Sequence, residues 1–264
     1  MMLRRLLLMA LALAAGACSS LPERVPNRTS VPQRTGLPQY TTLPAIERPS
    51  VNFGPRRPNF VIIHHTADDT AEGSLRTLTT PAFEVSAHYL IGRDGTLYYL
   101  VDELARAWHA GDGYWGGTRD LNSASIGIEL DNNGNEPFAQ PMIDTLLLLL
   151  EDLKTRYKIP AANFLGHGDI VPGRKVDPSR WFPWKRLAER GFGMWCEPPY
   201  PLNAAPVAVP DDALLLAALG YDVTRLNATR AAFRRHFLAV EDPSELTDNE
   251  RALLYCLIQR KLEK

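Results

Sequence analysis

A short apolar run decides the fold: Phe60-Val61-Ile62-Ile63-His64-His65-Thr66. Its aromatic and β-branched residues show no polar alternation, which predicts a strand buried on both faces. The run ends on two histidines. Successive side chains of a strand point to opposite faces, so only one of His64 and His65 can face a given site. Because apolar residues precede both, alternation does not choose between them, and we expect one of the two to be functional.

The segments that follow this run have the patterns of further strands and helices. Asp94-Gly95 is a hairpin signal, and Pro141 suits the first turn of a helix. Ser74 is expected to cap a short helix that ends near Leu78. The alternation of strands and helices around one sheet predicts an α/β or α+β domain over residues 59–197. Strands are expected at 86–91, 96–101, 124–130 and 163–166, and longer helices at 141–157 and 183–190.

The end of the chain has a helical pattern. Residues 198–210 are rich in proline and alanine and are expected to be a linker. Three helices are expected after it, at 211–219, 227–238 opened by Asn227, and 247–262, where Thr247 and Glu250 fit a capping box. Residues 211–264 are therefore expected to form a small three-helix domain, which is large enough to fold alone.

Residues 1–17 are expected to be an export signal. Two arginines precede the apolar run Leu6–Ala15, which is too short to span a bilayer. The stretch Ala15-Gly16-Ala17-Cys18 resembles a bacterial lipobox, in which Cys18 becomes the lipidated first residue. An ordinary signal peptide cut at the same small residues is the alternative. Ser19, rather than an aspartate, follows the cysteine, which favours a lipid anchor in the outer membrane, on its periplasmic face.

The stretch between signal and fold, residues 18–58, contains eight prolines and almost no hydrophobic periodicity, so we expect a tether. The formal net charge of −1 gives no electrostatic reason to expect a nucleic-acid partner. Export would place the fold in an oxidising compartment. Two cysteines remain beyond Cys18, and Cys196 could pair with Cys256; the sequence leaves this pairing open.

A loop rich in proline and glycine, residues 166–184, carries three polar side chains of chemical interest: His167, Lys175 and Asp177. Breakers at this density exclude a long helix or strand. A rigid loop with an imidazole, an ammonium and a carboxylate is more typical of a site than of a linker. We interpret it as half of a zinc site, since catalytic zinc takes three ligands from His, Asp, Glu or Cys. The chain has no His-Glu-x-x-His motif, so the ligands must come from separate elements.

Each of the polar residues also has a simpler reading. Asp177 could be a turn residue before Pro178, and Lys175 could lie on the surface. Glu129 stands in an apolar strand, where a buried carboxylate needs a partner or a function. Burial would raise its pKa, as a general base near neutral pH requires. A salt bridge to an arginine such as Arg119 is the alternative.

Five motifs carry a resemblance when taken in order. They are Ile62-Ile63-His64-His65-Thr66-Ala67, Ala87-His88-Tyr89-Leu90-Ile91-Gly92-Arg93-Asp94-Gly95, Ala107-Trp108-His109-Ala110-Gly111, Ser125-Ile126-Gly127-Ile128-Glu129 and Gly166-His167 with Lys175 and Asp177-Pro178. With these motifs the chain resembles the zinc-dependent N-acetylmuramoyl-L-alanine amidase family, which shares its fold with bacteriophage T7 lysozyme and the peptidoglycan recognition proteins. The resemblance covers about residues 59–185 and implies an α/β fold with a central mixed sheet flanked by helices.

The resemblance also implies roles for individual residues. The zinc ligands would be His64, His167 and Asp177. Glu129 matches the catalytic carboxylate of the family, and Lys175 matches its cationic residue two positions before the aspartate ligand. Three further residues would shape the substrate cleft or support it from behind: His88, Trp108 and His109.

The implied reaction is hydrolysis of the amide between N-acetylmuramic acid and L-alanine in peptidoglycan or muropeptides, an activity of cell-wall turnover. Besides this substrate, the expected partner is outer-membrane lipid through Cys18. We expect a monomer. The helices at 211–264 resemble a three-helix peptidoglycan-binding domain only weakly, and a packing appendage of the catalytic domain is the alternative. A non-catalytic peptidoglycan-binding lipoprotein is the rival function, and the four intact positions His64, Glu129, His167 and Asp177 disfavour it.

Overall fold

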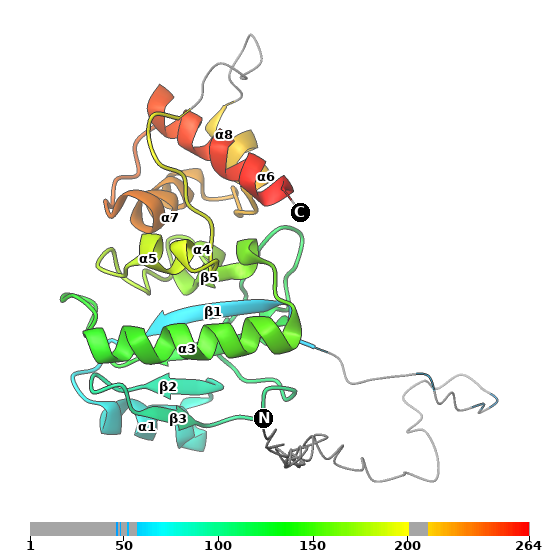
Figure 1. The fold of residues 1–264 in the computed structure, drawn as a ribbon, viewed down its shortest axis with the longest axis vertical. Coiled ribbons are helices and arrows are strands. Elements are labelled where there is room, and N and C mark those ends of the chain that lie inside the picture. The colour runs from blue at the N-terminus through cyan, green and yellow to red at the C-terminus, as the bar shows by residue number, and fades with distance from the viewer. Residues whose placement is uncertain (1–45, 47, 49–51, 53–56, 201–210, 264) are drawn as a thin grey trace, which may run out of the picture. The chain divides into compact units, whose positions relative to one another are not determined.

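The computed structural model describes residues 46, 48, 52, 57–200 and 211–263 (Figure 1). The expected export signal, Cys18, nearly all of the tether and most of the linker at 198–210 lie outside the described residues. Within the described part, no helix is long and apolar enough to cross a membrane. The described residues from 57 onward belong to one compact unit.

The centre of this unit is a mixed five-stranded sheet with the order β3-β2-β4-β1-β5. β1 (Phe60–His65) lies between β4 (Ser125–Leu130) and β5 (Phe164–Gly166) and is parallel to both. β2 (Tyr89–Ile91) is parallel to β4, and β3 (Leu97–Tyr99) closes the edge as the antiparallel partner of β2. The expected central mixed sheet is confirmed, and the run Phe60–His65 is one of its inner strands.

The two faces of β1 pack against different layers. Val61 and Ile63 belong to a core cluster with the buried side of α3 (Gln140–Tyr157). Phe60 and Ile62 belong to a second cluster. Because side chains alternate along a strand, His64 shares the face of Phe60 and Ile62. The burial of both faces explains the unbroken apolar run that the sequence shows.

Helix α3 covers one face of the sheet (Figure 1). A proline stands in its first turn, as expected, and the helix stops at Lys158, which has φ 55° and donates its N–H to the carbonyl of Lys154. Four of its five consecutive leucines are buried, but Leu148 is 72% exposed. The prediction that this helix is widely buried therefore holds for the other four leucines but not for Leu148, which faces solvent.

The helices α6 (Asp212–Leu219), α7 (Leu226–Leu238) and α8 (Asp248–Leu262) gather beyond the β5 edge of the sheet (Figure 1). They do not have a core of their own. Their buried leucines and phenylalanines form one cluster with Phe60, Ile62 and Leu165 of the sheet. A disulfide between Cys196 and Cys256, with Cα atoms 6.4 Å apart, ties α8 to the end of the preceding segment. The pairing that the sequence left open is thus present.

Several local expectations need correction. α1 (Ala71–Thr79) is capped by Thr70, whose side chain accepts from Gly73 N; Ser74 lies inside the helix. α7 begins at Leu226, one residue before Asn227, and has no side-chain cap. Thr247 does cap α8, with the reciprocal bond from Glu250. The shorter elements are the 3-10 turns η1 (Pro81–Phe83) and η2 (Ala161–Asn163) and the helices α2 (Leu121–Ala124), α4 (His167–Ile170) and α5 (Trp184–Glu189).

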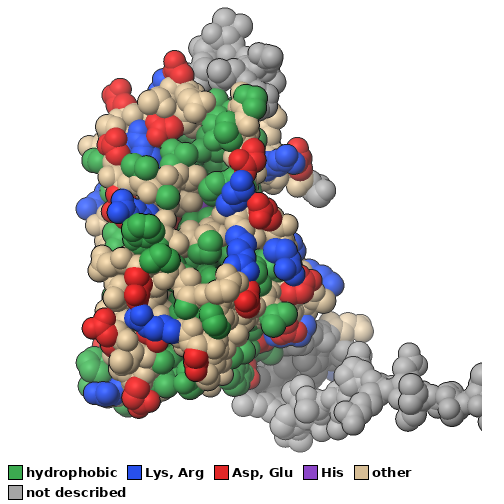
Figure 2. Space-filling view, turned by 60° about the vertical axis from the view of Figure 1, so that its left-hand side comes forward, with side chains coloured by type: hydrophobic (Ala, Val, Ile, Leu, Met, Phe, Trp, Pro, Cys, Tyr) green, Lys and Arg blue, Asp and Glu red, His purple; other side chains and the backbone are tan. Residues whose placement is uncertain are grey.

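Acidic and basic side chains are interspersed over the face drawn in Figure 2. This distribution agrees with a formal net charge of only −1. Apolar side chains lie between them as scattered groups, as is normal for a protein surface.

Candidate active site

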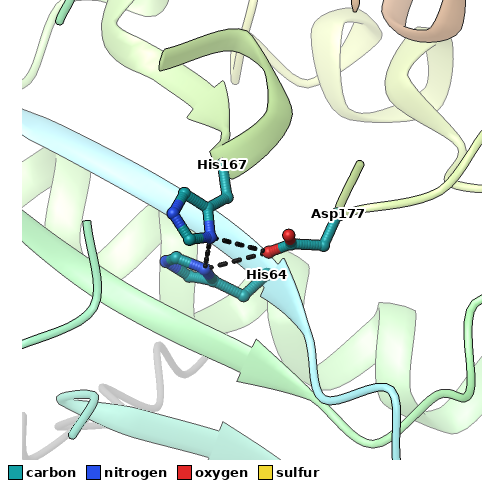
Figure 3. A group of neighbouring side chains, drawn as sticks. All are labelled: His64, His167 and Asp177. Atoms are coloured by element: carbon teal, nitrogen blue, oxygen red, sulfur yellow. Dashed lines mark hydrogen bonds and ion pairs between the residues drawn. The ribbon is translucent and has the colours of Figure 1, made fainter. Parts of the chain in front are cut away.

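Three buried side chains meet where β1 ends and α4 begins. His64 is the fifth residue of β1, His167 opens α4 directly after β5, and Asp177 lies in the loop that follows α4. Because β1 and β5 are parallel neighbours, their carboxyl ends bring the two histidines to the same edge of the sheet. Figure 3 shows the three side chains converging from these separate elements.

The geometry of the three side chains suits a metal ion. The Nδ1 atoms of His64 and His167 are 3.0 Å apart, and Asp177 Oδ2 lies 3.1 Å and 3.0 Å from them. Ligand atoms of a tetrahedral zinc ion lie about 2.0–2.1 Å from the metal and therefore about 3.3–3.4 Å from one another. Small side-chain movements would open the cluster to that spacing. Two imidazole nitrogens and one carboxylate oxygen form a ligand set that zinc accepts, with a fourth position left for water or substrate.

The electrostatics of the cluster favour metal binding over proton binding. Burial, followed by the proximity of His167, lowers the pKa of His64 from 6.5 to about 4. His64 is therefore neutral near pH 7, as a metal ligand must be. Burial alone would raise the pKa of Asp177, but its contacts with His167 and His64 hold that pKa well below the usual value. The site thus offers the neutral imidazole of His64 and the carboxylate of Asp177, with the imidazole of His167 beside them.

Glu129 lies on β4 directly beside His64, since the two residues are partners in the parallel register. Its Oε2 atom is shielded from solvent and has no hydrogen-bond partner among the described residues. Burial, followed by the negative charge of Asp177, raises the pKa of Glu129 from 4.5 to about 8, and Lys175 opposes this shift. A carboxyl group whose pKa lies near neutrality can accept and return a proton. The alternative salt bridge to Arg119 is absent, because that guanidinium lies over the ring of Tyr114.

The loop after α4 is held in place by its own backbone. Gly168 N donates to the carbonyl of Asp177 at 2.6 Å, and Lys175 N donates to the carbonyl of Val171. These bonds bring both ends of the loop to the group formed by His64, His167 and Asp177. The side chain of Lys175 is exposed and lines the cavity, so its ammonium can reach a bound substrate.

A cavity of about 420 Å³ opens over the cluster. Its lining combines the polar side chains that are expected to act in the reaction with apolar side chains, which is typical of a substrate site. Arg174, which the sequence analysis did not single out, adds a second cation beside Lys175. The residues that line the cavity are His64, His65, Thr66, Ala67, Asp68, Ser74, Thr77, Leu78, Val85, Ser86, Trp108, His109, Glu129, His167, Arg174, Lys175, Val176 and Asp177.

Of the three expected cleft residues, Trp108 and His109 line the cavity and His88 does not. Trp108 is 51% exposed at the rim, and His109 is buried against His64. His88 is fully buried, with Nδ1 accepting from Gly127 N and Nε2 beside the carbonyl of Ala105. Both ring nitrogens of His88 contact backbone atoms behind the cavity, so of the two roles expected for His88 the structure agrees with support of the cleft from behind and not with a place on its surface.

Asp169 is a buried residue that was not predicted from the sequence to belong to the site. Its Oδ2 accepts from Gly166 N at 2.8 Å and contacts Nδ1 of His236 at 2.7 Å, and its Oδ1 accepts from the hydroxyl of Tyr221 at 2.8 Å. Tyr221 follows α6 and His236 lies on α7, so the C-terminal helices hold the turn that carries His167. The signal in the sequence is an aspartate three residues after Gly166, at a position that bonds back to the start of the helix.

Comparisons with known proteins agree with this geometry. Residues 54–180 match a protein family described as N-acetylmuramoyl-L-alanine amidase. The chain is 36% identical to the N-acetylmuramoyl-L-alanine amidase AmiD of Escherichia coli over 233 residues, 77% of this chain and 83% of that protein. It is 37% identical to the 1,6-anhydro-N-acetylmuramyl-L-alanine amidase AmpD of Haemophilus influenzae over 126 residues, 45% of this chain and 68% of that protein.

Solved structures extend the similarity to the whole fold. E. coli AmiD in complex with the substrate anhydro-N-acetylmuramic acid-L-Ala-D-gamma-Glu-L-Lys superposes with a TM-score of 0.71 at 33% identity, covering 82% of this chain and 95% of that one. AmpDH3 from Pseudomonas aeruginosa in complex with anhydromuramic pentapeptide gives a TM-score of 0.70 at 31% identity, covering 84% of this chain and 99% of that one. A similarity of this extent, together with the site, identifies the chain as a member of the N-acetylmuramoyl-L-alanine amidase family of enzymes.

Proposed function

We propose that this protein is a zinc-dependent amidase that hydrolyses the bond between N-acetylmuramic acid and L-alanine in muropeptides or peptidoglycan. The observation that carries the proposal is the buried group of His64, His167 and Asp177 at the base of one cavity, with Glu129 beside it. The substrates named in the similar AmiD and AmpDH3 complexes are muropeptides of this kind. A binding protein without activity would not need a buried ligand set next to a carboxyl of raised pKa.

Each residue of the site has a separate role in amide hydrolysis. A zinc ion held by His64, His167 and Asp177 would polarise the scissile carbonyl and lower the pKa of a water molecule beside it. Glu129 takes the proton from the attacking water and passes it to the leaving amine of L-alanine. Lys175, at the cavity wall, stabilises the negative charge that develops on the carbonyl oxygen.

A defined muropeptide tests the proposal directly. The metal-free protein, the zinc-loaded protein and a Glu129→Gln variant loaded with zinc are incubated with anhydro-N-acetylmuramyl-tripeptide, and the products are identified by mass spectrometry. We expect free tripeptide only from the zinc-loaded wild-type protein. Intact substrate after incubation with that protein, despite stoichiometric zinc, would favour the non-catalytic rival.

We also propose that the protein is anchored to the outer membrane through lipid on Cys18. The support is the lipobox-like stretch and Ser19, which lie outside the described residues. Metabolic labelling with a fatty-acid analogue, compared between the wild type and Cys18→Ser, tests the anchor. Equal labelling of both proteins would contradict it.

A role of the C-terminal helices in peptidoglycan binding stays a prediction. These helices share their core with the sheet, so the test keeps the chain whole. The zinc-free protein is incubated with purified sacculi, and exposed positions of α8 are substituted by charged residues. Retention that these substitutions leave unchanged would favour the packing role.

A further inference from the structure

A chain of polar groups runs from His64 away from the metal cluster into the protein. The Nε2 atom of His64 lies 3.0 Å from Nδ1 of His109. The Nε2 atom of His109 lies 3.3 Å from the hydroxyl of Ser125. That hydroxyl donates to the carbonyl of Leu121 at 2.6 Å. His64, His109 and Ser125 are all at least nine-tenths buried, so bulk water does not replace these partners.

The hydrogen bond between Ser125 and the carbonyl of Leu121 decides which atom donates and which accepts in every other hydrogen bond of this series. A serine hydroxyl has one proton, and the carbonyl of Leu121, which can only accept, takes it. The oxygen of Ser125 must then accept from Nε2–H of His109. A second ring proton on His109 would place a positive charge in a buried position between the imidazoles of His64 and His88, so its Nδ1 is an acceptor. Nε2 of His64 must therefore carry the proton, which leaves the lone pair of its Nδ1 directed at the metal cluster.

We propose that Ser125 and His109 are positioning residues that fix the metal-binding tautomer of His64. The inference rests on the proposed zinc site. It assigns a function to His109 other than contact with substrate, although its ring reaches the cavity wall. A ligand nitrogen that is free of its proton before the metal arrives binds without a tautomer change.

The surroundings hold His109 in the required place. The side-chain oxygen of Asn122 accepts from both His109 N and Ala110 N, which fixes the backbone. The ring lies against Gly127, where a Cβ would come within 2.5 Å of the His109 Cγ atom. Gly127 is itself held by the bond from its N–H to Nδ1 of His88. The buried His88 thus helps to form the floor on which the ring of His109 lies.

The second histidine ligand has no such support. Nε2 of His167 is buried and has no hydrogen-bond partner among the described residues. Of the two proposed histidine ligands, only His64 therefore has a partner among the described residues that fixes the position of its ring proton. This asymmetry predicts that changes in the Ser125–His109 chain act on zinc binding through His64 alone.

Zinc affinity, measured by competition with a chromophoric chelator, tests the inference with three substitutions. His109→Phe keeps a planar ring against Gly127 but removes the acceptor, and zinc affinity is expected to fall about 10–100-fold. His109→Asn places an oxygen on Cγ, where Nδ1 was, and is expected to recover affinity to within about threefold of the wild type. Ser125→Ala, which removes the anchor at the far end, is expected to weaken zinc several-fold, whereas the exposed Ser123→Ala serves as a matched control without effect.

Long-range ¹⁵N–¹H spectra of the zinc-free protein provide a readout that a merely structural role would not move. We expect a protonated Nε2 and an unprotonated Nδ1 for both His64 and His109, and loss of this preference in Ser125→Ala. A proton on Nδ1 of His64 in the wild type would overturn the inference, as would equal zinc affinity in His109→Phe and His109→Asn. A wild-type protein that binds no zinc would instead refute the proposed function, so the two failures are distinguishable.

Discussion

The substitution Glu129→Gln is expected to stabilise the folded zinc-free protein while it removes activity. Burial, and then the charge of Asp177, raises the pKa of Glu129 from 4.5 to about 8. The folded state therefore binds this proton more tightly than the unfolded state. The proton on Glu129 therefore stabilises the folded state. This stabilisation is fully present below the unfolded-state pKa of 4.5 and is lost as the pH rises through the folded-state pKa of about 8.

The size of this effect follows from the two pKa values. Near pH 7, ionisation in the unfolded state but not in the folded state costs the wild-type protein on the order of 3 kcal/mol. A neutral amide of the same shape avoids this cost. At the same time, loss of a general base is expected to lower kcat about 10²–10⁴-fold. The same carboxyl thus destabilises the fold and serves the reaction.

Urea denaturation of the zinc-free wild type and Glu129→Gln over a series of pH values measures the difference. We expect a difference near zero at about pH 4 that grows to a plateau above about pH 8. Glu151→Gln, on the exposed side of α3, serves as the control and should show no such trend. A difference that does not depend on pH, or a less stable Gln variant, would refute the reasoning about burial of Glu129.

Three further predictions concern the metal, the oxyanion and the disulfide. Asp177→Asn should abolish stoichiometric zinc after dialysis, and tight zinc in this variant would remove Asp177 from the ligand set. Lys175→Ala should lower kcat about 100-fold with zinc content unchanged, whereas parallel loss of zinc and activity would contradict a role in charge stabilisation. Reduction of the Cys196–Cys256 bond, whose cysteines are 60 residues apart, should lower the free energy of unfolding by up to about 4 kcal/mol, and identical urea curves with and without reductant would contradict this.

Elements with a strong local signal could be predicted from the sequence. The run at β1 and the helix opened by Pro141 were recognisable because residues adjacent in the sequence indicate both the burial of a strand and the start of a helix. The cap at Thr247 was recognisable for the same reason, since both of its bonds are local. Thr70 and Ser74 are equally good caps by composition, so the sequence alone does not choose Thr70, which caps the helix in the structure.

The candidate site depended on contacts between distant segments. Alternation could not choose between His64 and His65, because both faces of β1 are covered and the layer that carries α4 is known only from the fold. The resemblance to a family chose His64 over His65. It also supplied the other proposed ligands and the catalytic pair, which are His167, Asp177, Glu129 and Lys175. It did not supply Asp169 with His236, or His109 with Ser125, because each of these pairs joins polar groups that the chain brings together only on folding.

The shared core of sheet and C-terminal helices has a consequence for the order of events during synthesis. The core cluster of Phe60, Ile62 and Leu165 stays incomplete until α6, α7 and α8 have been made. The turn that carries His167 likewise waits for α7, because Asp169 finds its partner His236 there. A nascent or truncated chain that contains every proposed metal ligand therefore still lacks the framework that holds them. We therefore expect a chain truncated before α6 to lose hydrolytic activity although it contains every proposed ligand.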